Sequence, residues 1–505
     1  MLWHSALLYA FKSLFNALMK NRLTICLLCL HFFAHAQTDS LTVNWAKPLM
    51  VSKSVSTLQV VVNPPLRRGS PIHNQTFAAL KDLGCDYVRF VPWLPYPRLG
   101  VAELQPPGSG KTYWDFSLID PITLDFLEAT KGHPVILNFS TIPQWMYKSD
   151  KPVTFPDHPD SVFWNYTQGT EPRDSTYREI GAYYASLYSW YTHGGFTDEL
   201  GNRHQSGYHY SVPYWEVLNE VDFEHSNTAE SYTRLYDEVV TAIKKVSPDT
   251  KFVGLALADP IRPEWYEYFL NPKNHREGVP LDMISYHFYA IGSADQSLER
   301  MQYSFFDHAD GFLNTVRFIE SIRKRLSPST KTTIDEIGSI LNSDFAPKEI
   351  PIDSAYWNLS GSLYAYLYLG LTKLGIDIIG ESQLMGYPTQ YPSVSMIDWI
   401  NGKPNSRYHV LKLIRDNFAP GDTLVDTDIP GNEEVLAQGF QTREGKKVLL
   451  VNKRNKTVRI NLNASFEKGV FSVVDPSTGE GPARTTSISN SFIEIKPFGV
   501  GVIRL

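Results

Sequence analysis

Cysteine is scarce in this chain, which has only three among its 505 residues. Two of them, Cys26 and Cys29, fall in an N-terminal segment that we expect to be removed on export, so that the mature chain keeps Cys85 alone. A single cysteine forms no internal disulfide and no cysteine-based metal site. An exported chain without disulfides depends on a large hydrophobic core, which is typical of a bacterial periplasmic or extracellular enzyme rather than a small disulfide-rich module.

The chain also lacks a strong excess of charge of either sign, with a net charge of -6 and a pI of about 6.2. This balance gives no electrostatic case for nucleic acid or an anionic membrane as a partner. The sequence has no Gly-x-Ser-x-Gly motif, which disfavours a Ser-His-Asp hydrolase. Its scattered histidines, among them His193, His204, His209 and His225, show no metal-ligand spacing. We therefore expect neither a metal nor an organic cofactor.

Residues 1–36 have the organisation of an export signal. A charged start precedes an apolar run and a small-x-small cleavage site: Lys20 and Arg22, then residues 23–33, then Ala34-His35-Ala36. Met19 is an alternative start, because residues 1–18 would be an unusual extension of such a signal. A membrane anchor is the competing interpretation, but the apolar run is too short to span a bilayer comfortably. A lipoprotein attached at Cys29 is a weaker alternative, because Leu28 is bulky where a small residue is expected. We predict a periplasmic or extracellular protein with no membrane partner after cleavage.

The composition is that of a globular protein, with 43% hydrophobic, 20% charged and 13% aromatic residues. A length of 505 residues exceeds one compact core and fits a barrel-sized domain with a smaller partner. Abundant Trp and Tyr suit the C–H faces of sugar rings, although a large barrel also buries many aromatic side chains.

Between residues 58 and 381, short β-branched or apolar runs alternate with longer amphipathic segments, the pattern of a parallel α/β fold. The predicted strands cover residues 58–62, 87–91, 135–139, 214–220, 252–257, 283–289, 332–336 and 376–381. Predicted helices cover residues 120–130, 231–246, 311–325 and 355–374. Eight such strands indicate a (β/α)8 barrel, which we assign to residues 37–417. A doubly wound sheet is the alternative.

After residue 416 the pattern changes to short alternating runs separated by Gly, Asn, Asp and Pro. These runs, at residues 448–452, 458–462, 470–474 and 492–495, predict an antiparallel β-sandwich over residues 418–505. Residues 41–51 are a candidate additional strand of that sandwich. A polysaccharide-binding module is one interpretation, but bracing of the barrel is favoured because the strands show no obvious exposed aromatic row. The oligomeric state stays undetermined.

Two of the predicted strands end in a glutamate, Glu220 and Glu336. Two βα units separate the strands that carry these acids. Both acids would still lie at the same end of the barrel, because the C-terminal ends of all its strands meet there and carry the catalytic groups. Paired carboxyls of this kind are what glycoside hydrolysis requires. We interpret Glu220 as the general acid/base and Glu336 as the nucleophile, whose charge would raise the pKa of Glu220. Taken singly, Glu220 is as readily a structural carboxylate, and Glu336 is more readily one.

Several further residues are candidates for the site: Arg89, Asn219, His287, Tyr289, Trp145, Glu381 and Trp399. Arg89 is a charge in an apolar strand, so it needs a carboxylate, and holding Glu336 ionised would be the best use. Asn219 beside the acid could hydrogen-bond the sugar hydroxyl next to the reacting carbon. His287 and Tyr289 alternate with period two and should point the same way. Structural ion pairs, buried polar groups and core packing are the simpler alternatives for these residues.

Two aromatic segments are candidate walls of the cleft. Residues 140–173 contain Trp145, Tyr147, Trp164 and Tyr166 in an unusually long loop, and such loops usually shape a substrate cleft. Residues 190–209 either wall the same cleft or pack on the underside of the barrel. Glu381 closes the last strand and could bind hydroxyls, and Trp399 follows it as a candidate stacking platform.

Taken together, these motifs resemble glycoside hydrolase clan A. They are Trp215 to Glu220 with Asn219-Glu220, Glu336, Arg89, Ser285 to Tyr289, and Tyr113-Trp114-Asp115-Phe116. Within the clan the chain looks most like family 39, which includes β-xylosidases and α-L-iduronidases and also carries a β-sandwich. Asp335, just before the expected nucleophile, does not match a pattern that we can assign to a specificity.

The resemblance implies a retaining double displacement in which the carboxyls of Glu220 and Glu336 lie about 5–5.5 Å apart. It suggests a secreted enzyme acting on an oligosaccharide or glycoside, with an exo-acting, β-xylosidase-like activity as the specific hypothesis. The alternative from another class is a non-catalytic carbohydrate-binding protein on a barrel scaffold. The sugar, its anomer and the choice between exo and endo action stay open.

Overall fold

The computed structural model describes residues 40–166, 169, 171–292, 296–345 and 351–505. The predicted export signal, with Met19, Cys26 and Cys29, lies outside these ranges. Within them, Cys85 is a buried free thiol. None of the described helices combines the length and the apolar composition needed to cross a membrane.

Eight parallel strands close into a barrel in the order β2, β3, β4, β7, β8, β9, β10, β11. Their bounds are Val55–Val61, Val88–Val91, Val135–Leu137, Tyr214–Glu216, Lys251–Leu257, Met283–Gly292, Lys331–Leu341 and Ile378–Glu381. Each of the eight predicted strands is present, because strands buried on both faces are recognisable as continuous apolar runs. The prediction of a (β/α)8 barrel is confirmed, and the doubly wound alternative is wrong.

The helices of the barrel are α2 His73–Leu83, α3 Pro97–Gly100, α4 Ile119–Ala129, α5 Arg178–Thr192, α6 Ala229–Val246, α7 Pro263–Phe269, α8 Leu298–Leu326, α9 Ser354–Leu374 and α10 Ser406–Arg415. Helix α6 begins with a capping box in which Thr228 and Ser231 exchange side-chain-to-backbone hydrogen bonds. Helix α8 is longer than predicted. Met301, Phe305 and Ala309 extend its buried face on the N-terminal side of Gly311, which sits in open space.

Short 3-10 helices occupy several connections: η1 Pro64–Leu66, η2 Gln144–Met146, η3 Pro272–Asn274, η4 Asn342–Phe345, η5 Pro392–Val394 and η6 Ala464–Phe466. A small hairpin of β5 (Gly195–Thr197) and β6 (Arg203–Gln205) lies outside the barrel sheet.

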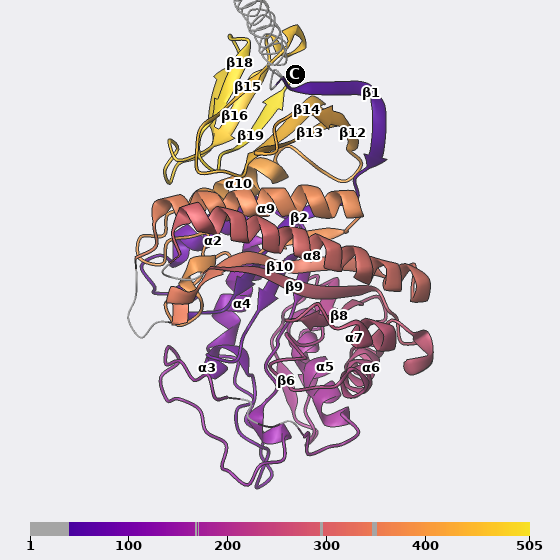
Figure 1. Cartoon of the computed structure of the whole chain (residues 1–505). Helices are drawn as coiled ribbons and strands as arrows, with labels where there is room; N and C mark the ends of the chain where they lie inside the picture. Colours follow the sequence, from indigo (N-terminus) through magenta and orange to yellow (C-terminus); the bar gives the residue numbers. More distant parts are fainter. Residues whose placement is uncertain (1–39, 167–168, 170, 293–295, 346–350) are drawn as a thin grey trace, which may run out of the picture.

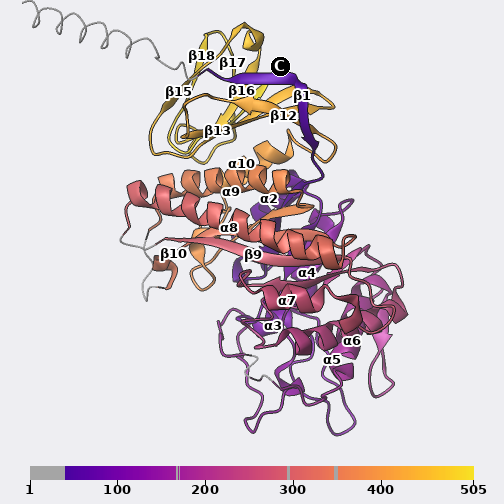
Figure 2. The ribbon, with the colours of Figure 1, turned by 45° about the vertical axis from the view of Figure 1, so that its right-hand side comes forward.

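A second domain packs beyond α9 and α10, where Figure 1 and Figure 2 show it in orange and yellow with β1 in indigo. Its larger sheet has the order β1, β12, β13, β14, β19, β16, β17, and β15 pairs with β18. The bounds are β1 Thr42–Val51, β12 Thr423–Asp428, β13 Val435–Thr442, β14 Gly445–Asn452, β15 Val458–Asn461, β16 Val470–Val474, β17 Arg484–Ser487, β18 Phe492–Ile495 and β19 Val500–Arg504. Buried Val448, Phe471 and Ile503 of the large sheet share a core with Ile460 and Ile495 of the small one.

Strand β1 pairs antiparallel with β12, so residues 41–51 do add a strand to this sheet. The second domain therefore draws strands from both ends of the described chain, whereas the sequence prediction assigned residues 37–417 to the barrel. Polar contacts fasten the two domains together. Asn455 Nδ2 donates to Glu299 Oε1 at 2.8 Å, and Lys403 Nζ lies 3.1 Å from Glu480 Oε2.

A buried ion pair joins the last barrel strand to the last barrel helix. Arg407 Nε lies 2.9 Å from Glu381 Oε1, and both side chains are fully buried. Asn405 caps α10 by accepting from the Arg407 backbone N–H at 3.0 Å. This pair fixes the start of α10 against the end of β11.

Replacing Arg407 with Met would leave the Glu381 carboxylate buried without its partner. We expect Arg407→Met to lower the free energy of unfolding by about 3–5 kcal/mol, measured by urea titration at pH 7. The control is Lys47→Ala, which breaks an exposed pair with Asp426 and should cost less than about 1 kcal/mol. Equal stability of the two variants would contradict this account of the pair.

Candidate active site

A cavity of about 360 Å³ lies at the C-terminal ends of the barrel strands. Its lining comes from β2, β3, β9 and β10 and from the segments that follow β3, β4, β7 and β11. The cavity contains the two predicted acids together with Asn219 and Tyr289. It is therefore placed where catalytic groups of barrel enzymes are found.

Glu336 lies within β10 and does not end the strand as predicted. The register of β10 against β9 shifts between Thr333 and Glu336, which marks an irregularity of the bulge type. Neighbouring residues of a regular strand point to opposite faces, but a bulge can bring two of them to one side. Here both Asp335 and Glu336 approach Arg89. The bulge was not visible in the sequence, because it depends on strand pairing.

Arg89 on β3 is fully buried and binds four side chains around it. Its Nη1 donates to Glu336 Oε1 at 2.6 Å and to Gln59 Oε1 at 2.8 Å. Its Nε donates to Glu216 Oε2 at 2.5 Å, and its Nη2 donates to Asn219 Oδ1 at 2.7 Å. The prediction that Arg89 would contact Glu336 is confirmed. Although burial opposes it, the neighbouring carboxylates raise the pKa of Arg89, so the guanidinium stays charged.

The second oxygen of Glu336 is held by Tyr289. The Tyr289 hydroxyl donates to Glu336 Oε2 at 2.6 Å and lies 2.6 Å from Ser382 Oγ. Gly338 provides room for this ring, since a Cβ there would lie 3.0 Å from Tyr289 Cε1. Both carboxylate oxygens of Glu336 thus accept hydrogen bonds, which fixes the orientation of this carboxyl group.

Glu220 follows a strand that is shorter than predicted, because β7 ends at Glu216. The backbone then turns through left-handed conformations at Leu218 (φ 67°) and Glu220 (φ 40°), which side chains other than Gly rarely adopt. Asn138 Nδ2 holds the turn by donating to the Leu218 carbonyl at 2.9 Å. Such conformations concentrate at functional sites, where surrounding contacts impose them.

His287 lies between the two acids. Its Nδ1 is 3.0 Å from Glu220 Oε1 and 3.5 Å from Glu336 Oε2, and its Nε2 is 3.5 Å from Asp335 Oδ1. One ligand atom from each of Glu220, His287 and Glu336 lies within 4.8 Å of the others. Burial lowers the pKa of His287, but the surrounding carboxylates win and raise it well above its ordinary value.

The three atoms have the spacing of a metal site, but their bonding does not suit one. Both oxygens of Glu336 already accept hydrogen bonds, from Arg89 and Tyr289. A protonated His287 offers no lone pair to a cation. The cluster is better described as a hydrogen-bonded group of acids and cations.

Burial raises the pKa of Glu220, the charge of Glu336 raises it further, and the hydrogen bond and charge of His287 oppose both. The Glu220 carboxyl therefore stays protonated to a higher pH than an ordinary glutamate. This is the protonation state that a general acid needs.

Two acids at the site were missed by the sequence analysis, Glu216 and Glu224. Glu216 is a buried charge in an apolar strand, the same signal that identified Arg89, and it could have been found in this way. Glu224 lines the cavity because its backbone N–H turns back to bond the Glu220 carbonyl at 2.7 Å. Its Oε1 accepts from Asn219 Nδ2 at 2.8 Å, so Asn219 is held by Glu224 as well as by Arg89.

Of the predicted substrate-binding residues, Asn219 and Tyr289 line the cavity, and Arg89 and His287 contact its acids from outside the lining. The other three do not belong to the described lining. Trp145 is buried, with its Nε1 donating to the Glu103 carbonyl at 2.8 Å. Glu381 is buried against Arg407. Trp399 lines a different cavity, between the barrel and the second domain. In each case the side chain packs against other residues of the protein rather than facing Glu220 and Glu336.

The aromatic wall of the cavity is instead formed by Trp93, Trp164, Tyr166, Phe223 and Tyr391. Trp93 packs edge-on against Trp164 with ring centroids 5.1 Å apart. Trp164 and Tyr166 come from the long loop at residues 140–173, so that loop does shape the cavity as predicted. Phe223 is 75% exposed and Trp164 is 44% exposed, which leaves apolar rings at the mouth.

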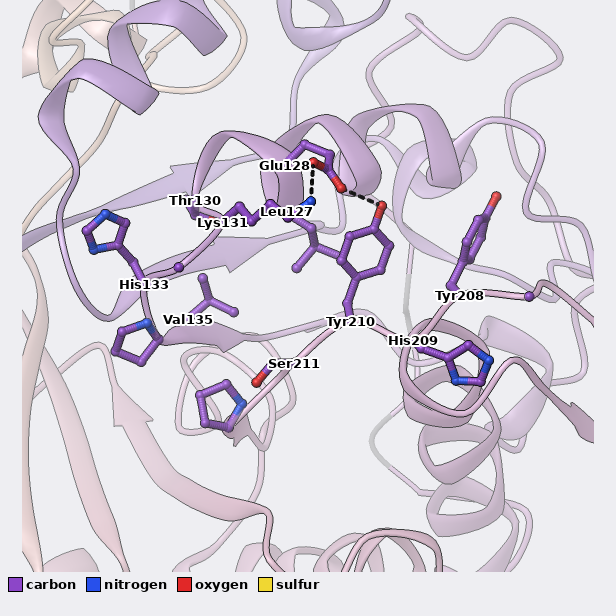
Figure 3. Close-up of a pocket in the computed structure, with 14 residues that line it drawn as sticks. Leu127, Glu128, Thr130, Lys131, His133, Val135, Tyr208, His209, Tyr210 and Ser211 are labelled. Atoms are coloured by element: carbon purple, nitrogen blue, oxygen red, sulfur yellow. Dashed lines mark hydrogen bonds and ion pairs between the residues drawn. The ribbon is translucent and has the colours of Figure 1, made fainter.

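The other aromatic segment, residues 190–209, ends at the opposite end of the barrel. Tyr208, His209 and Tyr210 line a separate cavity of about 630 Å³ beside His133, just before the start of β4 (Figure 3). There the Tyr210 hydroxyl donates to Glu128 Oε1 at 3.1 Å. No described residue of the segment 190–209 lines the cavity of Glu220 and Glu336. Trp190 and Phe196 of the same segment pack against Phe116 and Trp114, on the connection between β3 and α4. The segment therefore does not wall the catalytic cavity, and only its end at Tyr208 and His209 lies at the underside of the barrel.

An eight-stranded barrel with two glutamates at the mouth, one on an Asn-Glu pair after the fourth strand and one on the seventh, defines a clan A glycoside hydrolase. The comparison of sequences with protein families agrees, since residues 72–355 match "Glycosyl hydrolases family 39". The chain belongs to this family, and it is a retaining O-glycoside hydrolase. The resemblance noted from the sequence is confirmed, and the alternative of a non-catalytic binding protein is not supported.

Solved structures show the same fold at low sequence identity. A family 39 β-xylosidase from Caulobacter crescentus is 15% identical with a TM-score of 0.57. An α-L-arabinofuranosidase from Thermotoga maritima in an arabinose complex is 16% identical with a TM-score of 0.59. A family 30 endoxylanase from Clostridium papyrosolvens is 14% identical with a TM-score of 0.56. Each alignment covers 92% of this chain and 99% of the other. No curated protein matches the sequence.

The contact of His287 with Glu220 predicts a change in pH dependence. His287 favours the ionised form of Glu220, so His287→Gln should raise the pKa of Glu220 further. Activity that needs protonated Glu220 is lost as the pH rises through that pKa. We therefore expect the basic limb of the kcat/KM profile on an aryl glycoside to move to higher pH, with a fall in kcat/KM of about tenfold or more.

The matched control is His133→Gln, which changes a histidine in the cavity at the other end of the barrel. Its profile should coincide with that of the wild type. A basic limb that moves to lower pH in His287→Gln would contradict the assigned role of His287.

Proposed function

We propose that the protein is a secreted, exo-acting, β-xylosidase-like hydrolase that works by double displacement on Glu220 and Glu336. The observation that carries the two-glutamate assignment is the approach of one oxygen of each carboxyl to within 4.8 Å. Retaining enzymes place their carboxyls about 5–5.5 Å apart, whereas inverting enzymes need roughly 6.5–9.5 Å to admit a water molecule.

In the first step Glu336 attacks the anomeric carbon, and the bond from that carbon to the leaving oxygen breaks. Arg89 and Tyr289 hold both carboxylate oxygens of Glu336, so the nucleophile is oriented before the substrate arrives. Glu220 gives its proton to the leaving oxygen, which departs as an alcohol. The product of this step is a glycosyl ester of Glu336.

In the second step water attacks the anomeric carbon from the side of the departed group. Glu220, now ionised, removes a proton from this water, and the ester bond to Glu336 breaks. The imidazolium of His287, 3.0 Å from Glu220 Oε1, stabilises the ionised form of Glu220 between the two steps. Two displacements on one carbon return it to its original configuration.

The size and shape of the cavity support exo action, in which one small terminal sugar is removed from the substrate. A cavity of about 360 Å³ has room for one or two sugar rings rather than a polymer chain. Phe223 is three residues after the acid and largely exposed, so it is placed to contact the leaving group. The β-xylosidase preference rests on family membership, and the similar β-xylosidase of Caulobacter crescentus fits it.

Azide distinguishes the two glutamates. Glu336→Ala should lower kcat on an aryl glycoside by about 10³-fold or more, and azide should restore turnover by entering where the carboxylate was. The product is then a glycosyl azide of inverted configuration, which NMR identifies.

The matched variant is Glu220→Ala, which leaves the nucleophile in place. Azide should attack the glycosyl ester of that variant and yield a glycosyl azide of retained configuration. Full activity of Glu336→Ala without azide would refute the mechanism, as would the same azide configuration from both variants.

Export is supported by the sequence of residues 20–36 alone. Expression of the whole chain in a Gram-negative host should give a periplasmic or extracellular protein whose first residue, read by N-terminal sequencing, is Gln37. Ala36→Leu should block cleavage because a bulky residue cannot occupy that position. An intact N-terminus at Met1 or Met19 in the cytoplasm would show that the segment is no cleaved signal.

A further inference from the structure

A cavity of about 690 Å³ lies between the barrel and the second domain, and the proposed mechanism does not use it. Its walls are the start of α9, the segment that leads from β11 into α10, and the turn between β16 and β17. We call it the interdomain cavity. Its volume is within the range of small-molecule sites and exceeds that of the catalytic cavity, about 360 Å³.

The interdomain cavity lies directly beside the catalytic cavity. Val394 lines the catalytic cavity, and the next residue, Ser395, lines the interdomain cavity. Both residues belong to the segment that follows the C-terminal end of β11. A single stretch of backbone therefore separates the two cavities at this point, and both lie at the catalytic end of the barrel.

Two tryptophans line the interdomain cavity, Trp357 on α9 and Trp399 on the segment after β11. Both rings are half-buried against the core of the barrel. Neither of their indole N–H groups donates a hydrogen bond to a described residue, whereas those of Trp93, Trp145 and Trp190 each have an acceptor. Trp357 and Trp399 thus offer a ligand both an apolar face and a hydrogen-bond donor.

Trp399 sits on a turn that its own hydrogen bonds hold in place. Asp398 Oδ1 accepts from the backbone N–H groups of Ile400 at 2.8 Å and Asn401 at 2.9 Å. The two ends of the turn, residues 397 and 404, pair in an antiparallel bridge. The ring is therefore positioned before a ligand arrives, which lowers the entropic cost of binding.

Polar groups stand beside the two rings. Asp398 uses only Oδ1 in the turn, so its Oδ2 accepts no hydrogen bond from a described residue. Lys403 Nζ lies 3.1 Å from Glu480 Oε2 across the two domains, and both side chains are largely exposed. Flat apolar rings beside a few polar groups suit a sugar, whose C–H face stacks while its hydroxyls form hydrogen bonds. A purely apolar partner would desolvate Asp398 and the ion pair without replacing their contacts with water.

We propose that the interdomain cavity is a second, non-catalytic sugar-binding site, in which Trp357 and Trp399 stack on sugar rings of a glycan. A glycan held here stays close to the catalytic cavity, which raises its effective concentration at the acids. A small glycoside that occupies only the catalytic cavity gains nothing from this site. The inference goes beyond the proposed function and depends neither on exo action nor on a preference for xylose.

Oxidation of tryptophan by N-bromosuccinimide, mapped by mass spectrometry, tests the site directly. The protein carries Glu336→Ala so that it does not consume the probes, which are trisaccharides of β-1,4-linked xylose, glucose and mannose. At least one probe at saturation should abolish the oxidation of Trp357 and Trp399. Trp45 should react as in the free protein, because it packs on the core of the second domain and lines neither cavity.

Trp164, which lines the catalytic cavity and is partly exposed, reports that cavity separately in the same experiment. Protection of Trp357 and Trp399 supports the proposal whether or not Trp164 is protected, so a failure of the proposed function is distinguishable from a failure of this inference. Protection of Trp164 alone, or no protection by any of the three probes, overturns the second site.

Trp399→Ala tests what the site contributes. Its affinity for a soluble polysaccharide of the protecting sugar, measured by affinity electrophoresis, should fall about fivefold or more, because one stacking ring is lost. Its kcat/KM on an aryl glycoside should stay at the wild-type value. Trp45→Ala, which also removes a half-buried tryptophan, is the matched control and should keep the wild-type affinity. Unchanged affinity in Trp399→Ala, or an equal loss in both variants, contradicts the proposal; if Trp399→Ala does not fold, the oxidation map decides.

Discussion

The contacts of the Arg89 guanidinium are the interaction on which the site depends. A charged group inside a barrel is tolerated only when carboxylates and other acceptors surround it. Arg89 meets this requirement by binding Gln59 on β2, Glu216 on β7, Asn219 beyond β7, and Glu336 on β10. One side chain therefore sets the relative positions of the strands that carry or precede Glu216, Asn219 and Glu336.

The positive and negative charges below the cavity balance because the buried acids there differ in pKa and therefore in protonation. Burial raises the pKa of Glu216 to about 7, with Arg89 opposing it. Burial acts in the same direction on Asp335, but Arg89 and His287 lower its pKa below the ordinary value. Arg89 and His287 thus face several acids, some of which are protonated and uncharged. The bulge in β10 adds Asp335 to these acids by bringing its side chain toward Arg89. Because the acids differ in protonation, Glu220 can keep its proton although Glu336 lies nearby.

Sequence reasoning recovered the eight strands, because continuous apolar runs mark strands buried on both faces. It also paired Arg89 with Glu336, since a buried charge requires a partner. It could not place Glu381, whose partner Arg407 lies on a helix that packs from outside the barrel. Nor could it find Glu224, which reaches the cavity only through the tight turn after Glu220. Turns, bulges and the direction of loops depend on long-range packing, which a single sequence does not display.

The central claim is that Arg89 and Tyr289 present Glu336 as the nucleophile. The most direct measurement is to inactivate the enzyme with a 2-deoxy-2-fluoro glycoside of a sugar that it cleaves and to map the labelled peptide by mass spectrometry. The account predicts one sugar per chain, esterified to Glu336 and released slowly with retained configuration. A label on Asp335 or Glu224, or a product of inverted configuration formed without any label, would contradict it.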